Sequence, residues 1–506
     1  MATKSCKRPL SFSLDRHAAS TFNIKKMGSS IFSGDSKGKE SFSDRPSPLD
    51  FDNFIPWLCI EMQVPHLVTV KKKNQEKYVR TERRTSSSRC KSMRSLSMKP
   101  KVDEESTKRG LTSASNTVVT RSSLVDSSIV PITAYYDPHG HLTEIAITVC
   151  SFPLHRKVIQ AINVCVPFHS FLTKLVIRKG CLDYLLVYEV GKLLPHSNLT
   201  DVCLDDSYVP EGNYYVLLDQ ASDIRYLSLN RCKINDAVCK EIASRLDFER
   251  PAEKSLMVLD LGSNKITDVG AKYFGEVLRR NRHLLHLNFQ GNRITDTGLG
   301  FILKSLCEFP LTSDEIIDKK RRKYEYLRRK NEVYEHCLEE VTRMQKPEKS
   351  LHSYSLHGSK HAKFKKTKKS MSNLVEESLA GMAEKMTLEL LGPLNDPFDD
   401  DCCIIKDNYI YSTGNLKLCS LNVAYNNIEF PSLPRILEVL KYQFRLEKNP
   451  SHTGLVRLVL AGNYLPDFCS ELDSIQMYLK DARASQIPVG AHTGHPKRKT
   501  SHKHKA

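Results

Sequence analysis

Residues 256–294 read LMVLDLGSNKITDVGAKYFGEVLRRNRHLLHLNFQGNRI and contain one pattern twice. With Leu256 placed over Leu284, the two copies align at a period of 28 residues. Each copy begins with LxxLxL, an alternation of period two that is typical of a strand with one buried face. Asn264 and Asn292 follow where the chain leaves the strand, and a buried amide there can satisfy backbone groups that the turn leaves unpaired.

The second half of each copy predicts a helix. Residues 269–278 carry aromatic and aliphatic side chains at helical spacing, and Arg279 and Arg280 follow in the last turn, where cations oppose the helix dipole. Asp268 and Asp296 stand at the start of the two predicted helices and suit the N-cap position. A strand, a turn and a helix that recur with a period in the twenties predict a leucine-rich repeat.

Six further copies extend the pattern in both directions. Apolar side chains recur at offsets 0, +3, +5 and +10 of every copy, which a hydrophobic content of 40% would not produce by chance. The +8 position is Asn in four copies and Cys150, Gly180, Ser207 or Cys232 in the others. The eight copies begin at Leu142, Leu172, Leu199, Ile224, Leu256, Leu284, Leu418 and Leu455.

The turns TDVGA at residues 267–271 and TDTGL at residues 295–299 resemble those of the ribonuclease-inhibitor type of leucine-rich repeat, over roughly half of the chain. The resemblance implies an α/β fold: a curved leucine-rich-repeat solenoid with short parallel strands on its concave face and helices on its convex face. It also implies a binding role, usually with another protein. The overall layout resembles leucine-rich-repeat proteins that are associated with cilia or the axoneme.

Composition indicates a protein without a cofactor or a membrane span. The 15 cysteines include no pair of CxxC motifs and no Cys/His cluster with zinc spacing, so we expect most of them to fill the core. The first residues lack the apolar segment of a signal peptide, and no apolar run is long enough to span a bilayer. We therefore expect a cytoplasmic protein in a reducing compartment.

The net charge of +18 is concentrated outside the repeats. Residues 1–48 are rich in Ser, Lys and Gly and are expected to be a disordered basic tail. Residues 51–64 contain the only Trp and predict a short ordered element that either caps the solenoid or docks on a partner. Residues 132–141 predict a hairpin or cap with Pro138 and Gly140 in its turn.

Residues 71–110 form a basic, Ser-rich stretch in which three serines follow arginine or lysine residues. Those positions would suit basic-directed kinases, and phosphate there would cut the positive charge. The stretch also fits a solvated linker. Nucleic-acid binding is disfavoured because aromatic residues are not interleaved with the basic ones. The three candidate phosphorylation sites are Ser86, Ser92 and Ser97.

An insertion of about 106 residues separates the sixth repeat from the seventh, because Leu284 and Leu418 are 134 positions apart and one period is 28. Residues 313–345 predict a long basic helix, and a stripe from Ile317 to Val341 predicts coiled-coil-like packing. Residues 372–391 predict an acidic amphipathic helix, and residues 396–414 predict a hairpin. The two helices either pair with each other or leave the stripe free for a partner.

Period two places the residues between the buried leucines on the concave face. Tyr, Arg, His and Asp side chains in such positions are good contact residues, although each also fits an ordinary solvated strand residue. Lys174 and Arg178, for example, would then pair with Asp201 and Asp205 across the sheet. The candidate protein-binding residues are Lys174, Arg178, Asp201, Asp205, Tyr226, Asn230, Asp260, His286, Asn288 and Arg457.

Catalytic motifs are missing from the sequence. It contains no GxxxxGK[ST], GxSxG or HExxH, and the run Asp399 to Asp401 lacks the spaced ligands of a calcium loop. The expected function is a non-catalytic leucine-rich-repeat scaffold that binds proteins through its concave face and its helical insertion, in a ciliary or axonemal assembly. The alternative is an adaptor whose basic segments bind an acidic polymer, either a cytoskeletal filament surface or nucleic acid.

These expectations divide the chain into seven parts: a disordered basic tail (1–48), a short ordered segment or cap (49–70), a basic Ser-rich linker (71–130), repeats 1–6 (131–311), a helical charged insertion (312–415), repeats 7–8 with a C-terminal cap (416–480) and a basic disordered tail (481–506).

Overall fold

The computed structural model describes residues 45–74, 129–148, 152–180, 182–344, 368–446 and 454–485, and only the backbone of residues 368–378 and 485. The chain divides at Ser47, and the fold below is that of the unit from Pro48 onward. The expected disorder of most of both tails, and the serines at 86, 92 and 97, lie outside the described residues.

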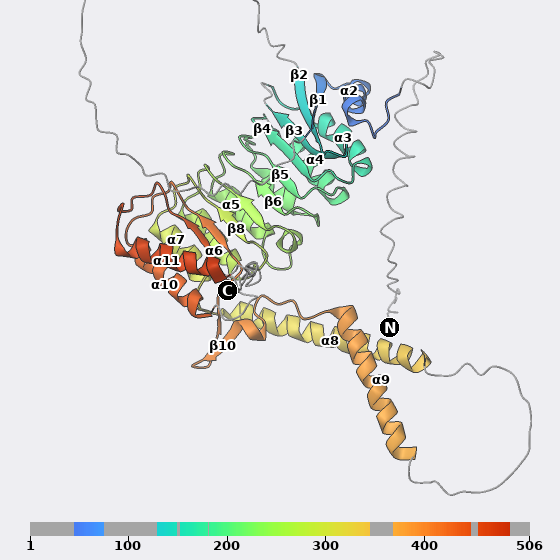
Figure 1. Cartoon of the computed structure of the whole chain (residues 1–506), viewed down its shortest axis with the longest axis vertical. Coiled ribbons are helices and arrows are strands. Elements are labelled where there is room, and N and C mark those ends of the chain that lie inside the picture. Colours follow the sequence, from blue (N-terminus) through green and yellow to red (C-terminus); the bar gives the residue numbers. More distant parts are fainter. Residues whose placement is uncertain are drawn as a thin grey trace, which may run out of the picture. The chain divides into compact units, whose positions relative to one another are not determined.

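One sheet of ten strands runs through the repeats, in the order β1-β2-β3-β4-β5-β6-β7-β8-β12-β13 (Figure 1). From β3 onward all neighbours are parallel, and β2 pairs antiparallel with β3. Each of the eight predicted copies supplies one strand: β3 (Leu142–Thr148), β4 (Lys174–Arg178), β5 (Asp201–Cys203), β6 (Tyr226–Ser228), β7 (Val258–Asp260), β8 (His286–Asn288), β12 (Ser420–Asn422) and β13 (Arg457–Val459).

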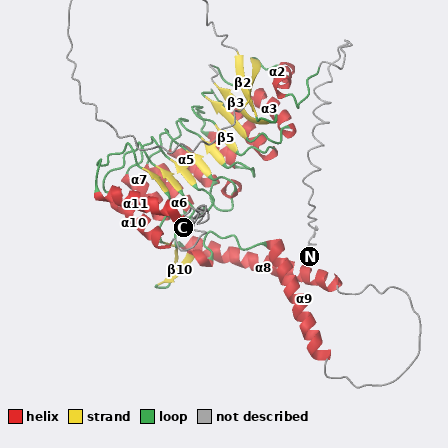
Figure 2. Cartoon of the chain, viewed as in Figure 1, coloured by secondary structure: helices red, strands yellow, loops and turns green. Residues whose placement is uncertain are grey.

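A helix or a short 3-10 turn returns the chain from each strand to the next, so the structure is a curved leucine-rich-repeat solenoid, as expected (Figure 2). The helices are α3 (Arg156–Cys165), α4 (Tyr184–Leu193), α5 (Asp236–Arg245), α6 (Asp268–Leu278), α7 (Asp296–Ser305), α10 (Ser432–Leu446) and α11 (Ser470–Ser485); the 3-10 turns are η1 (Val166–Phe168), η2 (Leu194–His196), η3 (Asn213–Leu218) and η4 (Pro251–Lys254).

The core lies between the sheet and these helices. In the fifth repeat the four apolar offsets are Leu256, Leu259, Leu261 and Ile266, and none has any exposed surface. A single repeat could not bury these side chains alone, so each repeat depends on its neighbours. The register predicted from the sequence is confirmed.

The asparagine at offset +8 joins each of the last four repeats to the one before it. Asn292 donates from Nδ2 to the carbonyls of Leu261 and Phe289, at 3.0 and 2.9 Å, and its Oδ1 accepts from the Ile266 amide at 3.1 Å. Asn264 and Asn426 repeat the arrangement. The two N–H donors and the acceptor oxygen of the side-chain amide therefore satisfy backbone groups of both neighbouring repeats.

The helix caps differ from the prediction. Thr267 and Thr295 are the N-caps of α6 and α7, and Asp268 and Asp296 are the first residues of those helices. The carboxylate of Asp268 is turned to the next repeat, where it accepts from the Thr295 amide at 2.7 Å and from its hydroxyl at 2.6 Å. In this position Asp268 satisfies two donors of the next repeat and so links the two repeats. As an N-cap it would bond only within its own helix.

The N-terminal end of the solenoid is covered by α2 (Phe51–Glu61), β1 (Leu67–Asn74) and β2 (Ile129–Tyr136). Phe51, Phe54 and Ile55 of α2 are buried in the core, and Lys157 of α3 donates to the Met62 carbonyl at 2.8 Å. These contacts favour the cap over the partner-docking alternative. Residues 71–74 and 129–130, which were expected in the linker, lie in strands, and α11 continues to Ser485, past the expected start of the C-terminal tail.

The insertion leaves and rejoins the solenoid at one place. Repeats six and seven stack directly, with Leu287 opposite Leu421 in a parallel pair. The Asn415 amide donates to the Ser305 carbonyl at 2.8 Å, so the entry and exit are adjacent. Between them lie β9 (Phe309–Pro310), α8 (Ser313–Met344), α9 (Lys368–Leu391), η5 (Asp400–Cys402), β10 (Cys403–Lys406) and β11 (Tyr409–Ser412).

The two insertion helices pack against each other, but α8 does not use the predicted coiled-coil stripe. Ile317, Tyr324 and Leu327 are 61%, 68% and 50% exposed, whereas Cys337 and Val341 are buried. The chain that returns from α9 runs along the opposite side of α8, where Tyr326 donates to the Gly392 carbonyl at 2.9 Å. Polar contacts on that side outweighed the apolar periodicity, so the stripe prediction was wrong for the first half of α8.

Gly298 should not tolerate a methyl group, because a Cβ there would lie 2.3 Å from the Asp268 Oδ1 atom and 2.9 Å from the Asp268 Cα atom. We expect Gly298→Ala to lower the free energy of unfolding by about 1–3 kcal/mol in chemical denaturation. Gly381 in α9 is the matched control, since nothing lies within 4 Å of its Cβ position. Gly381→Ala should be neutral or stabilise by up to about 1 kcal/mol. Equal effects at both sites would contradict this packing.

Candidate protein-binding surfaces

The predicted contact residues all lie on the face of the sheet opposite the leucine core. The strand register aligns them in rows that cross the repeats. The first row is Glu144, Lys174, Asp201, Tyr226, Val258, His286, Ser420 and Arg457, and the second is Ala146, Val176, Cys203, Ser228, Asp260, Asn288, Asn422 and Val459. Arg178, Asp205 and Asn230 follow two residues after the second row.

Charged residues of the first repeats pair with one another. Lys174 lies 3.1 Å from Glu144, and Arg178 lies 3.9 Å from Asp205. The Arg178–Asp205 pair was anticipated, whereas Lys174 binds Glu144 of the preceding strand rather than Asp201. Such half-exposed pairs contribute little to stability, about 0–1 kcal/mol each, so they remain available to a partner.

The second row, which lies between these two sets of charges, is apolar in these repeats. Ala146, Val176 and Cys203 form a small cluster of their own on the face opposite the leucine core, with Tyr135 of β2 packed against it. The sequence pattern did not reveal Tyr135, because residues 132–141 were assigned to a cap rather than to the binding face. In the N-terminal half of the face, an apolar centre therefore lies between two rows, and each of these rows contains a pair of opposite charges.

The second row becomes polar and acidic from Ser228 onward, and Asp205, two residues beyond this row, bonds to it. Asp205 accepts from the Ser228 hydroxyl at 2.5 Å and from the Asn230 amide at 3.0 Å. Asp260 accepts from the Gly262 amide and from Asn288 Nδ2, both at 2.8 Å. Burial raises the pKa of Asp260, and the nearby Asp205 charge adds to that effect against the lowering by these hydrogen bonds. A basic group of a partner would relieve this acidic centre.

The later repeats expose two basic side chains on the first row. His286 and Arg457 are both exposed, and burial followed by the Arg457 charge lowers the pKa of His286. His286 therefore remains mostly neutral at physiological pH and offers a hydrogen bond more than a charge. In this part of the face only Arg457 carries a full positive charge on the row.

The described residues include no group of three His, Cys, Asp or Glu side chains close enough to hold a metal ion. No helix in the described ranges is long and apolar enough to cross a membrane. The cysteines that the structure places are free thiols, and more than half of them are buried. The face of the sheet opposite the leucine core carries rows of charges and amides around a small apolar centre.

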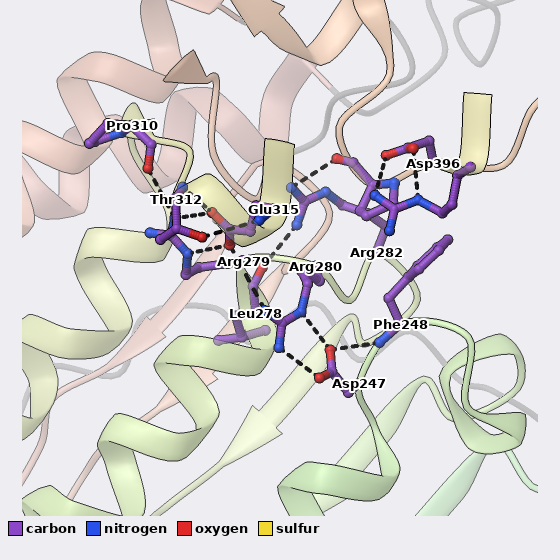
Figure 3. Close-up of polar contacts among 12 residues, drawn as sticks. Asp247, Phe248, Leu278, Arg279, Arg280, Arg282, Pro310, Thr312, Glu315 and Asp396 are labelled. Carbon is purple, nitrogen blue, oxygen red and sulfur yellow. Dashed lines mark hydrogen bonds and ion pairs between the residues drawn. The ribbon is translucent and has the colours of Figure 1, made fainter. Parts of the chain in front are cut away.

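Figure 3 shows how the insertion is fastened to the repeats. Arg279 of the α6 end forms a bidentate pair with Glu315 of α8, at 2.9 and 2.6 Å, and donates to the Pro310 carbonyl at 3.0 Å. Burial alone would raise the pKa of Glu315, but Arg279, the Thr312 amide and the Arg280 charge together outweigh it and hold that pKa below its usual value. Arg280 pairs with Asp247 at 2.7 and 2.6 Å.

Two further arginines hold the returning chain. Arg322 of α8 pairs with the buried Asp396 at 2.8 and 3.1 Å, and its guanidinium lies 5.1 Å from the centre of the Phe248 ring. Arg282 donates to the Pro397 carbonyl at 3.3 Å, and burial lowers its pKa to about 10, which leaves it charged at neutral pH. No sequence signal pointed to these pairs, since their partners are 74 and 115 residues apart.

A leucine-rich-repeat family model matches residues 254–275 and 280–303. The matched residues are most of the fifth repeat and most of the sixth, from which the pattern was first derived. No curated protein matches the chain in sequence.

Two solved structures are similar to this chain at low identity. The structure titled leiomodin-1 actin-binding site 2 has 11% identity and a TM-score of 0.24, over 51% of this chain and 80% of that one. An internalin from Listeria monocytogenes has 13% identity and a TM-score of 0.24, over 62% of this chain and 54% of that one. These values are too low for either likeness to bear on function.

Asp260→Asn should keep the fold and should not destabilise it at pH 7. The Asn Oδ1 atom can accept the same bonds from Gly262 and Asn288, while the carboxylate charge is removed. Because folding raises the pKa of Asp260, the wild type loses stability as the pH rises from the unfolded-state pKa through the folded one. Thermal melts at pH 4 and 7 should show an equal or higher melting temperature for the variant at pH 7.

The exposed Asp467 is the control for that variant, since Asp467→Asn should change the melt little at either pH. A lower melting temperature of Asp260→Asn at pH 7 would show that the carboxylate stabilises the face.

Proposed function

We propose that this chain is a non-catalytic scaffold that binds proteins through the concave face of its repeat sheet and through its helical insertion. The observation that carries the proposal is the alignment of ten contact-type side chains, which span the second to the eighth repeat, on one continuous sheet face. These residues are Lys174, Arg178, Asp201, Asp205, Tyr226, Asn230, Asp260, His286, Asn288 and Arg457.

The face offers two different halves to a partner. Around Ala146, Val176 and Cys203, an apolar contact would be framed by paired charges. Around Asp205 and Asp260, a basic side chain of the partner would be held by two carboxylates. A protein surface carries both kinds of group, whereas a polyanion would be repelled by the acidic half.

The insertion supplies the second surface. Its α8 is fixed to the solenoid by the pair of Glu315 with Arg279, and Arg282 of the repeats holds the returning chain at the Pro397 carbonyl, so α8 is a positioned element rather than a free tether. Ile317, Tyr324 and Leu327 remain exposed on it at helical spacing, which suits a helix of a partner laid alongside. Insertions in repeat proteins often mark the binding face.

A ciliary or axonemal assembly is the setting that the sequence resemblance implies, and cytoplasmic location is part of the same proposal. The second candidate function is an adaptor whose basic segments bind an acidic polymer, either a filament surface or nucleic acid. The charge of +18 favours it. Salt separates the two, because an electrostatic contact weakens steeply as salt rises and a contact with an apolar centre does not.

Removing contact side chains from the first row should abolish partner binding without unfolding the repeats. Tyr226, His286 and Arg457 are aligned across the sheet, and their replacement together by Ser should weaken the contact at least tenfold. Partners are identified by affinity purification from ciliated tissue and then titrated in purified form at two salt concentrations. Serine replacement of Tyr188, Lys240 and Lys272 on the convex helices is the control.

Equal binding by both triple variants would refute the concave face as the contact surface. A wild-type contact that disappears between low and moderate salt would favour the acidic-polymer adaptor instead.

Deleting residues 309–412 and joining the ends by a short glycine linker should leave the repeats folded. The insertion has its own small core of Phe309, Leu311 and Phe398, and the two ends lie together, as a Cβ on Gly414 would be 2.5 Å from the Cys307 carbonyl oxygen. Circular dichroism should show a cooperative melt, and purification should show the loss of at least one partner. Loss of the cooperative melt would make the insertion part of the core, and an unchanged partner list would make it dispensable.

A further inference from the structure

A second surface follows the rim of the solenoid, one residue after the buried +8 position. From the third repeat to the eighth, this offset carries only exposed side chains. We call these residues the rim row: Tyr208, Lys233, Lys265, Arg293, Asn427 and Tyr464.

Backbone hydrogen bonds hold the rim row in register. The amides of Lys265 and Arg293 each donate to the preceding repeat at 2.8 Å, and those of Asn427 and Tyr464 do so at 2.9 Å. The Lys233 ammonium lies 4.6 Å from the centre of the Tyr208 ring, which shows that side chains of successive repeats meet. Since neighbouring strands are about 4.8 Å apart, the row is a ladder of evenly spaced groups.

The middle of the ladder is cationic. Lys233, Lys265 and Arg293 come from three successive repeats, and none of them forms an ion pair with any residue that the structure describes. The neighbouring Arg231, by contrast, is paired with Asp206. Three aligned, uncompensated cations concentrate positive potential along this rim.

The C-terminal end of the ladder is aromatic. Tyr464 is 71% exposed and Phe468 is 92% exposed, on the loop after the last strand. Tyr425 of the preceding repeat lies against Gly462, where a Cβ would be 2.4 Å from its Cδ1 atom. Large apolar rings so exposed, and gathered on adjacent loops, are typical of a binding surface.

We propose that the rim row binds an extended acidic peptide that carries an aromatic or aliphatic residue at one end. Carboxylates would meet Lys233, Lys265 and Arg293, and the apolar end would lie on Tyr464 and Phe468. The four repeat steps from Lys233 to Tyr464 span about 19 Å, which corresponds to about six residues of extended chain. The rim is separate from the concave rows, so this proposal stands or falls independently of them.

A peptide fits the rim better than a nucleic acid does. The cationic part of the ladder is only three residues long, and Asp205 and Asp206 follow a nearby strand. A nucleic acid carries a charge on every nucleotide and would bring phosphates close to these carboxylates. A peptide can place neutral residues there and restrict its charges to the cations.

The test uses the full-length chain and a fluorescein-labelled peptide with three glutamates at alternate positions followed by two tryptophans. Fluorescence anisotropy should show binding that weakens as salt is raised. Replacing Lys233, Lys265 and Arg293 together by Glu should lower the affinity at least tenfold, and replacing them by Gln should lower it less. Tyr464→Ser with Phe468→Ser should weaken this peptide severalfold but not a version with alanines in place of its tryptophans.

The matched control reverses Lys240, Lys272 and Lys304, which are exposed on α5, α6 and α7 of the same three repeats. That variant has the same net charge as the rim variant and should bind the peptide like the wild type. Equal losses in both variants, or equal binding of a glutamine version of the peptide, would overturn the proposal. Tighter binding of a labelled oligothymidine than of the peptide would assign the rim to nucleic acid instead. Melting curves for each variant separate a lost contact from a lost fold.

Discussion

The structure depends on one hydrogen-bonding pattern, the asparagine amide that links each of the last four repeats to the one before it. A leucine core gives cohesion but little order, because apolar contacts are non-directional. The Nδ2 atom of Asn426 donates to the Phe289 and Val423 carbonyls, and its Oδ1 accepts from the Ile294 amide. Two repeats can satisfy these groups only in one register, so the amide fixes the stacking that the leucines favour.

Repeats without the asparagine show what the amide adds. At the same offset the Cys232 thiol donates to the Leu204 carbonyl at 3.1 Å, and the Ser207 hydroxyl donates to the Ile177 carbonyl at 3.2 Å. Each replaces only part of the amide's bonds. In the third repeat Tyr214 completes the turn, since its hydroxyl donates to the Ser207 carbonyl and accepts from the Val209 amide. The third and fourth repeats thus reach the same geometry with different chemistry.

This stacking also explains how a long insertion is tolerated. Asn426 bonds across 137 residues of sequence as if its repeat followed the sixth directly. The insertion therefore starts and ends at the same point, and the cost of closing its loop grows only slowly with its length. Arg279 and Arg282 then fasten it to the repeats, because Arg279 pairs with Glu315 and Arg282 donates to the Pro397 carbonyl of the insertion.

The sequence predicted what is periodic and missed what is not. Eight strands could be placed because Leu259, Leu287 and their equivalents recur at fixed offsets in a common core. The partner of Lys174, the second role of Asp268 and the buried face of α8 depend on residues from other repeats or from the returning chain. Periodicity within one segment carries no information about such contacts. The pairing of Arg279 with Glu315 is likewise invisible, because either residue alone resembles an ordinary helix-end charge.

A solenoid converts equal sequence offsets into spatial rows, so its surfaces can change character along the stack. On the concave face the second row changes from Ala146 and Val176 to Asp260 and Asn288, that is, from apolar to acidic and amide. On the rim the row changes from Lys233 and Lys265 to Tyr464. The two gradients run along the same axis on two separate surfaces. On either surface, a partner that lies along the repeats would therefore meet a different chemistry at each end of its contact, which sets both its position and its direction.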